Sequence, residues 1–145
     1  MNKVKIIECP RDAMQGIKTH FISTNAKARY INSLLNVGFD TIDFGSFVSP
    51  KAIPQMRDTA AVLSKLDLSQ TQSKLLAIIA NIRGANDASQ FEEISYLGYP
   101  FSISENFQMR NTHKTIHQSI KELEEILSIA SKNNKEVVAY LSMGF

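Results

Sequence analysis

The segment 75–81, Leu-Leu-Ala-Ile-Ile-Ala-Asn, constrains the fold more than any other part of the sequence. Successive side chains of a strand point to opposite faces of the sheet, so a strand wetted on one face alternates apolar and polar residues. Residues 75–80 are all apolar, and such a strand has two apolar faces. The segment therefore predicts a strand of a parallel sheet that is covered on both sides.

Other apolar runs alternate with helical patterns along the chain. Strands are also predicted at residues 4–8, 41–47, 101–104 and 137–142, and a turn at 9–12. Thr24 is expected to cap a helix that ends at Gly38, and Pro54 to lie in the first turn of the next helix. The alternation indicates an α/β fold with five parallel strands, four intervening helices and right-handed crossovers. No linker interrupts it, so residues 1–145 are expected to form one uninterrupted domain or part of one.

Two further helices are predicted to place apolar residues on one face. One begins at Arg83 and Gly84, with Ile94 facing inward and Gly98 closing the turn that follows. The other runs through residues 116–130, where Ile120 and Leu127 belong to an apolar stripe.

Charge and cysteine content exclude several classes of protein. Sixteen Lys and Arg against fourteen Asp and Glu leave a net charge of +2, and the basic residues are dispersed, so nucleic acid is not an expected partner. No apolar run approaches the ~20 residues that span a bilayer, and the amino terminus lacks the pattern of a signal peptide. The single cysteine, Cys9, favours a reducing, cytoplasmic location.

Arg11 and Asp12, which follow the first predicted strand, are the most informative polar pair. In α/β folds, functional residues gather after the carboxyl ends of the strands. A carboxylate there can bind Mg²⁺ or Mn²⁺, and a guanidinium can stabilise an oxyanion or enolate formed beside the metal. The alternative is a solvated ion pair without a catalytic role.

Asp43 is the second candidate, because it interrupts the apolar strand at 41–47. Burial raises the pKa of a carboxyl group and suits it to general acid or base catalysis. The alternative is a buried acid that is satisfied by a neighbouring arginine or by backbone amides.

Three other features carry weaker signals. His113 and His117 have a spacing that can bind one metal ion on a helix, but no third ligand is evident, which favours surface histidines. Cys9 has no histidine partner in the sequence nearby, which favours a packing role over that of a nucleophile. The sequence contains no glycine-rich phosphate-binding loop.

Two segments resemble signatures of the hydroxymethylglutaryl-CoA lyases, which are metal-dependent lyases on a (β/α)₈ TIM barrel. Residues 8–15, Glu-Cys-Pro-Arg-Asp-Ala-Met-Gln, are similar to the first-strand signature of that family. Residues 46–51, Ser-Phe-Val-Ser-Pro-Lys, followed by Pro54-Gln55-Met56, match the second signature closely. Asn111 and residues 140–142 also fall where the family has similar residues, so the resemblance covers nearly the whole chain.

The resemblance implies a function and a role for each matching residue. It implies cleavage of 3-hydroxy-3-methylglutaryl-CoA to acetyl-CoA and acetoacetate, with Asp12 as a ligand of Mg²⁺ or Mn²⁺. Arg11 would stabilise the enolate, and Asp43 stands where the family carries a glutamate implicated in acid–base catalysis. The acyl-CoA pocket would be lined by Gln15, Lys18, Ser46 and Asn111.

The chain departs from the family at some positions and in length. Cys9 and Ala13 replace glycines, Met14 replaces leucine, and Asp43 is shorter than the glutamate. A (β/α)₈ barrel needs about 250 residues, so the chain is expected to be the amino-terminal part of one barrel domain, truncated before the family's His-x-His ligands. The isolated chain is then expected to be inactive.

Two other functions stay open at this point. One is a non-catalytic half-barrel that needs a partner, either a second copy or the missing carboxyl-terminal half. The other is a related aldolase or a condensing enzyme similar to 2-isopropylmalate synthase. The Ser-Phe-Val-Ser-Pro-Lys segment favours the lyase.

Overall fold

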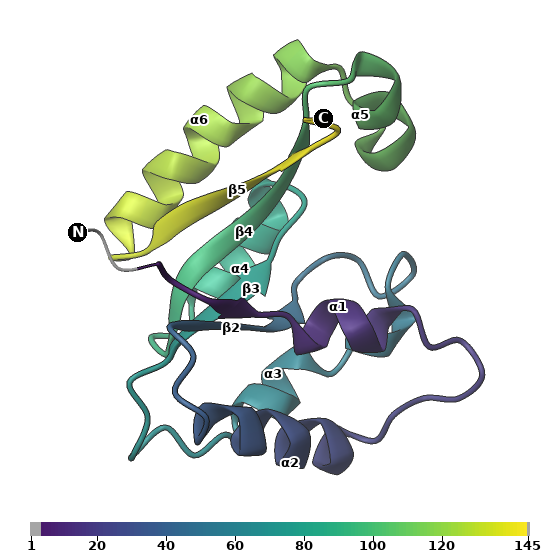
Figure 1. The fold of residues 1–145 in the computed structure, drawn as a ribbon. Coiled ribbons are helices and arrows are strands. Elements are labelled where there is room, and N and C mark those ends of the chain that lie inside the picture. Colours follow the sequence, from purple (N-terminus) through teal and green to yellow (C-terminus); the bar gives the residue numbers. More distant parts are fainter. Residues whose placement is uncertain (1–3, 145) are drawn as a thin grey trace. The chain divides into compact units, whose positions relative to one another are not determined.

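The computed structural model describes residues 4–144, in which five parallel strands are hydrogen-bonded in chain order (Figure 1). The strands are β1 (Ile7–Glu8), β2 (Thr41–Ser46), β3 (Lys74–Ile78), β4 (Ile94–Ser102) and β5 (Glu136–Ser142). The helices are α1 (Pro10–Gln15), α2 (Thr24–Leu35), the 3₁₀ helix η1 (Pro54–Met56), α3 (Thr59–Leu63), α4 (Ile82–Ser89), α5 (Glu105–Thr112) and α6 (Ile116–Lys132). Each of the four connections between strands is helical, so the predicted α/β class is confirmed.

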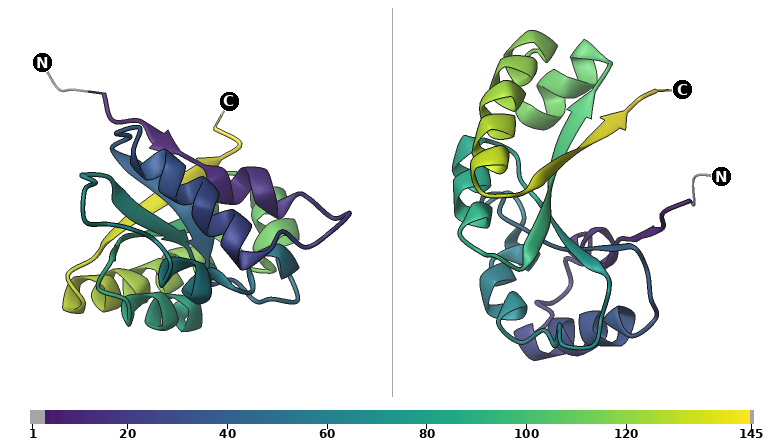
Figure 2. Two further views of the ribbon diagram at one scale, coloured as in Figure 1. Left: turned by 90° about the horizontal axis from the view of Figure 1, so that it is seen from below. Right: turned by 90° about the vertical axis from the view of Figure 1, so that its left-hand side faces the viewer.

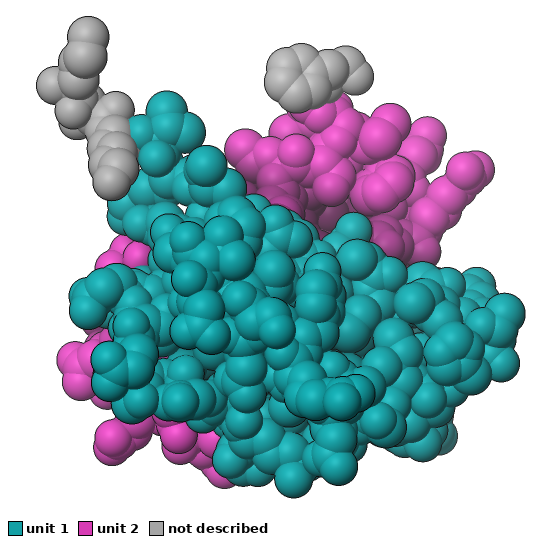
Figure 3. Space-filling view, turned by 60° about the horizontal axis from the view of Figure 1, so that its bottom comes forward, with its two compact units in different colours: residues 1–76 teal, residues 77–145 magenta. Residues whose placement is uncertain are grey.

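The chain divides into two compact units, residues 1–76 and residues 77–145 (Figure 3). In the first unit β1 pairs in parallel with β2, with Ile7 opposite Thr41. The amide of Lys74 donates to the carbonyl of Asp40 at 2.9 Å, which starts β3 beside β2. Helices α1, α2 and α3 all contact β2, and all six residues of β2 are buried as a result.

The second unit contains the end of β3 together with β4 and β5. The amide of Ile79 donates to the carbonyl of Gly98 at 2.8 Å, and β4 pairs with β5 from Tyr96 opposite Glu136 to Ser102 opposite Ser142. Helices α4 and α6 contact each other and β4 (Figure 2). Residues 75–79 are buried, as their two apolar faces predict.

Three local predictions in the first unit need correction. Residues 10–15 form helix α1 instead of an open turn, because Pro10 at the first helical position fits the helix without an amide donor. The cap of α2 is Ser23, whose hydroxyl accepts from the amide of Ala26, and not Thr24. Gly38 adopts a left-handed φ of 91° but lies in the turn beyond the end of α2 at Leu35.

Two predictions in the second unit were also wrong. Ile94 and Gly98 lie in β4, which begins at Ile94 and not at residue 101. Of the stripe predicted for α6, Ala130 is buried, but Ile120 and Leu127 are 44% and 49% exposed, because the helix packs also through Ser119 and Ile126. Helix α5 was not predicted.

No helix in residues 4–144 has both the length and the apolarity needed to cross a bilayer.

Candidate functional site

Helix α1 presents Arg11, Asp12 and Gln15 directly after β1. Pro10 begins the helix with a φ already suited to it, so the polar residues that follow lie on its first turns. Residues three and four apart are neighbours on a helix surface, which brings Gln15 next to both Arg11 and Asp12. The short helix thus arranges three polar side chains as one group.

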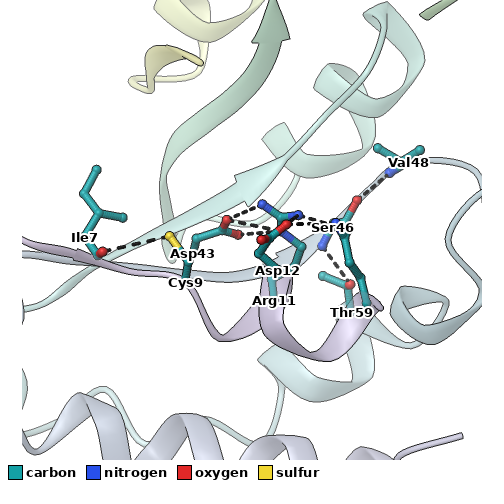
Figure 4. Close-up of polar contacts among 9 residues, drawn as sticks. Ile7, Cys9, Arg11, Asp12, Asp43, Ser46, Val48 and Thr59 are labelled. Carbon is teal, nitrogen blue, oxygen red and sulfur yellow. Dashed lines mark hydrogen bonds and ion pairs between the residues drawn. The ribbon is translucent and has the colours of Figure 1, made fainter. Parts of the chain in front are cut away.

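The guanidinium of Arg11 forms a buried, two-pronged ion pair with Asp43 of β2 (Figure 4). Its Nε donates to Oδ1 at 3.1 Å and to Oδ2 at 3.2 Å, and its Nη2 donates to Oδ2 at 2.5 Å. The side chain of Asp43 is fully buried and that of Arg11 is 9% exposed. The planar fork of arginine matches both carboxylate oxygens, so the pair fixes the direction of the guanidinium.

The remaining nitrogen of the guanidinium faces the solvent side of the same group. Nη1 of Arg11 donates to Oδ1 of Asp12 at 3.0 Å and to Oε1 of Gln15 at 2.9 Å, and Nε2 of Gln15 donates to Oδ1 of Asp12 at 2.9 Å. Asp12 has a 65% exposed side chain, in contrast to Asp43. Arg11 therefore joins a hidden carboxylate to an exposed one.

Burial raises the pKa of the Asp43 carboxyl group above its ordinary value, although hydrogen bonds and charge from Arg11 oppose the rise. Both interpretations of Asp43 from the sequence thus meet in one residue. It is a buried acid satisfied by an arginine, and its pKa is shifted in the direction that suits proton transfer.

Cys9 lies beside this group, and burial together with the charge of Asp43 raises the pKa of its thiol. A raised pKa disfavours the thiolate, which is the nucleophilic form. The Sγ atom approaches the carbonyl of Ile7 at 3.9 Å. These observations agree with the packing role that was favoured from the sequence.

Ser46, at the end of β2, is held by hydrogen bonds on both sides. Its amide donates to Oγ1 of Thr59 at 3.0 Å, and its Oγ accepts from the amide of Val48 at 3.1 Å. Thr59 Oγ1 also donates to the carbonyl of Met56 at 2.8 Å. Gly45 permits this approach, because a Cβ at that position would lie 2.5 Å from Cγ2 of Thr59.

Gln15 and Lys18 line a pocket of about 300 Å³ within the first unit. Its wall includes Phe21, and Arg57 contributes a second cationic side chain. Among residues 4–144, no Asp or Glu lines the pocket. Two of the residues predicted to contact substrate therefore share one cationic pocket.

Asn111, the remaining residue predicted to bind substrate, is exposed on α5 in the second unit. The same unit carries His113, in a left-handed conformation at the end of α5, and the exposed His117 on α6. Within residues 4–144 no group of three His, Cys, Asp or Glu side chains is placed to hold a metal ion. A metal site centred on the two histidines is thus unsupported.

Two residues with central contacts were not assigned a role from the sequence. They are Thr59, which holds the end of β2, and Gln55, which is 5% exposed and makes three side-chain hydrogen bonds to backbone groups. Gln55 lies inside the Pro-Gln-Met segment of the second signature, so its position could have drawn attention to it. Nothing in the local sequence marks Thr59.

Curated relatives of the chain are named hydroxymethylglutaryl-CoA lyases, whereas no family model matches the chain. It is 35% identical over 143 residues to the mitochondrial hydroxymethylglutaryl-CoA lyase of Macaca fascicularis, a match that covers 97% of this chain and 42% of the relative. It is 33% identical over 144 residues to the lyase of Bacillus subtilis, covering 99% of this chain and 47% of the relative. The chain spans less than half the length of these relatives.

Solved structures give the same result for the fold. The crystal structure of the Bacillus subtilis HMG-CoA lyase matches with a TM-score of 0.87 and 33% identity, over 96% of this chain and 46% of that one. An Acinetobacter baumannii HMG-CoA lyase in complex with coenzyme A and 3-methylmalate matches with a TM-score of 0.85 and 30% identity, over 94% and 44%. The predicted likeness to part of a TIM-barrel lyase is confirmed. In sequence and in fold, the chain is similar to hydroxymethylglutaryl-CoA lyases, and an amino-terminal portion of such a lyase fits the matched length.

Proposed function

We propose that this chain supplies part of the active site of a hydroxymethylglutaryl-CoA lyase, which cleaves 3-hydroxy-3-methylglutaryl-CoA to acetyl-CoA and acetoacetate. The observation that carries the proposal is the arrangement of Arg11 between the buried Asp43 and the exposed Asp12. The pairing with Asp43 fixes the guanidinium next to Asp12, and a positive charge held in a fixed position can stabilise negative charge that develops beside it. The names of the relatives supply the substrate.

In this proposal Asp12 is one ligand of a divalent cation, Mg²⁺ or Mn²⁺. The carboxylate fits a hard cation, because its side chain is 65% exposed and only Oδ1 accepts the hydrogen bonds from Arg11 and Gln15. When bound, the cation would polarise substrate oxygens and acidify the tertiary hydroxyl. One carboxylate makes an incomplete site, so the remaining ligands must come from other residues.

Arg11 and Asp43 form the proposed catalytic pair. Arg11 would stabilise the enolate that forms as the carbon–carbon bond breaks, from an orientation that its pairing with Asp43 already fixes. Asp43 would act in acid–base catalysis, as its raised pKa suits. Both of its carboxylate oxygens accept from Arg11, so the guanidinium would have to move aside before Asp43 could exchange a proton with the substrate.

Acyl-CoA is the proposed ligand of the pocket that Gln15 and Lys18 line. Lys18 and Arg57 place two cationic groups there, and no acidic side chain of the described residues lines the pocket, which suits the phosphate groups of coenzyme A. We propose substrate contacts also for Ser46, at the end of β2, and for Asn111. The A. baumannii relative was solved with coenzyme A, which supports this ligand class.

The same proposal covers the organisation and location of the protein. We propose that residues 1–145 belong to one barrel domain and act in the cytoplasm. Relatives with cytoplasmic and with mitochondrial names both occur.

A second candidate function is that of a non-catalytic partner protein. It is favoured by exposed apolar side chains in each unit, Val4 and Ile6 before β1 and Leu141 and Met143 at β5, with exposures between 55% and 83%. A second copy of the chain or a carboxyl-terminal half could cover such residues. A tight homodimer without affinity for coenzyme A would favour this candidate, whereas Claisen condensation without cleavage would favour a condensing enzyme.

The test joins this chain to the part of the Bacillus subtilis lyase that it does not match. With Mg²⁺ or Mn²⁺ present, we expect the chimera to form acetoacetate and the 145-residue chain alone to form none. Asp12→Asn and Arg11→Gln should each lower kcat/KM of the chimera about 100-fold or more, since each removes charge stabilisation of the transition state. Asp67→Asn, which changes another exposed aspartate, is the matched control and should leave the rate unchanged.

Binding of coenzyme A to the chain alone provides a second measurement that does not depend on the chimera. Calorimetry should show weaker binding after Lys18→Ala and unchanged binding after Lys65→Ala, which alters another exposed lysine. Coenzyme A binding that is insensitive to Lys18, together with an inactive but folded chimera, would refute the proposed function.

A further inference from the structure

The buried carboxamide of Gln55 is bonded entirely to one short segment of backbone. Its Oε1 accepts from the amide of Ile22 at 2.9 Å. Its Nε2 donates to the carbonyls of Ile17 and His20 at 2.9 and 3.0 Å. One side chain thus fixes three backbone groups of residues 17–22.

This segment has no regular secondary structure to hold its shape, although the Phe21 ring contacts Lys27 and Arg57. Residues 17–23 connect α1 to α2 and lie outside any helix or strand. A segment without its own ladder of hydrogen bonds depends on side chains or water to satisfy its backbone groups. Gln55 meets that requirement from 33 to 38 residues away along the chain.

The backbone of Gln55 is itself held by a buried lysine. Lys27 Nζ donates to the backbone carbonyl of Gln55 and pairs with Oδ1 of Asp58 at 2.6 Å. Oδ2 of Asp58 accepts from Thr24 Oγ1 at 2.7 Å. The carboxamide therefore extends from a buried, charge-paired base that joins η1 to α2.

The segment held by Gln55 forms one wall of the cationic pocket, which Lys18 and Phe21 line from it. Arg57 also lines the pocket, and its guanidinium stacks on the Phe21 ring of this segment at 3.9 Å from the centroid. The spacing of the two cationic side chains therefore depends on the conformation of residues 17–22.

We propose that Gln55 is the positioning residue of this pocket: it holds residues 17–22 so that Lys18 and Arg57 together receive the phosphate groups of coenzyme A. The inference rests on the proposed function for the identity of the ligand. Gln55 is itself among the residues that line the pocket, but both ends of its carboxamide are bonded to the backbone of residues 17–22, so it acts on the ligand through that segment. Preorganisation of this kind improves affinity by removing the entropic cost of ordering the pocket.

The orientation of the carboxamide makes the proposal testable by an isosteric change. Its oxygen faces an N–H donor and its nitrogen faces two carbonyl acceptors, so the two ends are not interchangeable. In Gln55→Glu an ionised oxygen would face the two carbonyls and both donated hydrogen bonds would be lost. Gln108→Glu is the matched control, because Gln108 is a buried glutamine of the second unit that donates to Ser119 Oγ at 2.7 Å.

Two measurements on the 145-residue chain test the proposal. Hydrogen exchange at the Ile22 amide should accelerate about tenfold or more in Gln55→Glu, and the affinity for coenzyme A should fall by a similar factor, the change that corresponds to about one hydrogen bond. Gln108→Glu should alter neither the exchange rate at Ile22 nor the affinity for coenzyme A, even if it lowers global stability as much as Gln55→Glu does. Pyrophosphate and pantetheine, tested separately, show which part of the ligand responds, and we expect the loss with pyrophosphate.

The outcomes separate this inference from the proposed function. Faster exchange at Ile22 with unchanged coenzyme A affinity would overturn the positioning role. If the wild-type chain binds neither coenzyme A nor pyrophosphate, the ligand assignment and the role derived from it are both refuted, whatever the exchange rates. If Gln55→Glu does not fold, hydrogen exchange of the wild-type protein still tests the proposal. An Ile22 amide that exchanges as fast as the amides of the exposed residues Lys18 and Thr19 would overturn the positioning role of Gln55.

Discussion

Replacement of Gly45 by alanine should destabilise the first unit through a single defined contact. The added Cβ would lie 2.5 Å from Cγ2, 3.0 Å from Oγ1 and 3.3 Å from Cβ of Thr59. Thr59 cannot turn away freely, because its Oγ1 donates to the carbonyl of Met56 and accepts from the amide of Ser46. Either helix α3 must shift away from strand β2, or these two hydrogen bonds of Thr59 must break.

Both routes lead to a similar magnitude. Overpacking of a buried site costs about 1–3 kcal/mol, and breaking the two hydrogen bonds of Thr59 would cost about 1 kcal/mol each. We therefore expect Gly45→Ala to lower the free energy of unfolding by about 2 kcal/mol. Thr59→Ser removes only Cγ2, which makes the shortest contact, and should cost about 1 kcal/mol by itself.

The double variant Gly45→Ala/Thr59→Ser provides the decisive comparison. Its cost should fall short of the sum of the single costs by about 1 kcal/mol or more, as measured by urea unfolding followed by circular dichroism. Gly16→Ala is the matched control, because no atom outside the neighbouring residues lies within 4 Å of the position of its Cβ, and its φ is −76°. A fully additive double variant, or a Gly45→Ala cost no larger than that of Gly16→Ala, would refute the reasoning.

Two further predictions concern buried polar groups. Asp43→Asn should lower the free energy of unfolding by about 3 kcal/mol, because it removes the main partner of the buried Arg11. Asp12→Asn, which changes the exposed partner of Arg11, should lower it by less than about 1 kcal/mol. Equal midpoints of urea unfolding for the two variants would contradict this. Burial beside Glu122 raises the pKa of Tyr99, so the unfolded state loses that proton first as the pH rises above about 10. Stability should therefore fall with rising pH in that range, and Tyr99→Phe should show a smaller fall; the same decline in both proteins would show that Tyr99 is not responsible.

The parts of the fold that were predicted have a clear local signal, and the others do not. β3 was predicted because its residues are apolar on both faces. The start of β4 was missed because Gly98 and Pro100 are typical of turns, whereas in the sheet they are accommodated between two neighbouring strands. On α6 part of the apolar stripe was wrongly placed because a polar residue, Ser119, is buried there, where its hydroxyl accepts from Gln108 and its carbonyl from Tyr99.

The site shows the same limit of local sequence patterns. Arg11 and Asp43 were each selected from their own surroundings, but their pairing across 32 positions required the fold. Gln55 is marked in the sequence only by its place in the second signature, and its role required the fold because its partners are backbone groups of a distant connection. Whether Arg11, Asp12, Gln15, Lys18, Asp43, Ser46 and Asn111 have the roles implied by the resemblance remains a prediction.

The arrangement in which Arg11 bridges two unlike carboxylates has a consequence for protein chemistry. A water-soluble carbodiimide can react with Asp12, whose side chain is exposed, but it cannot reach Asp43, whose side chain is fully buried. The guanidinium of Arg11 thus separates Asp43 from the solvent. Reagents, ions and protons would have to displace it before they reached the Asp43 carboxylate.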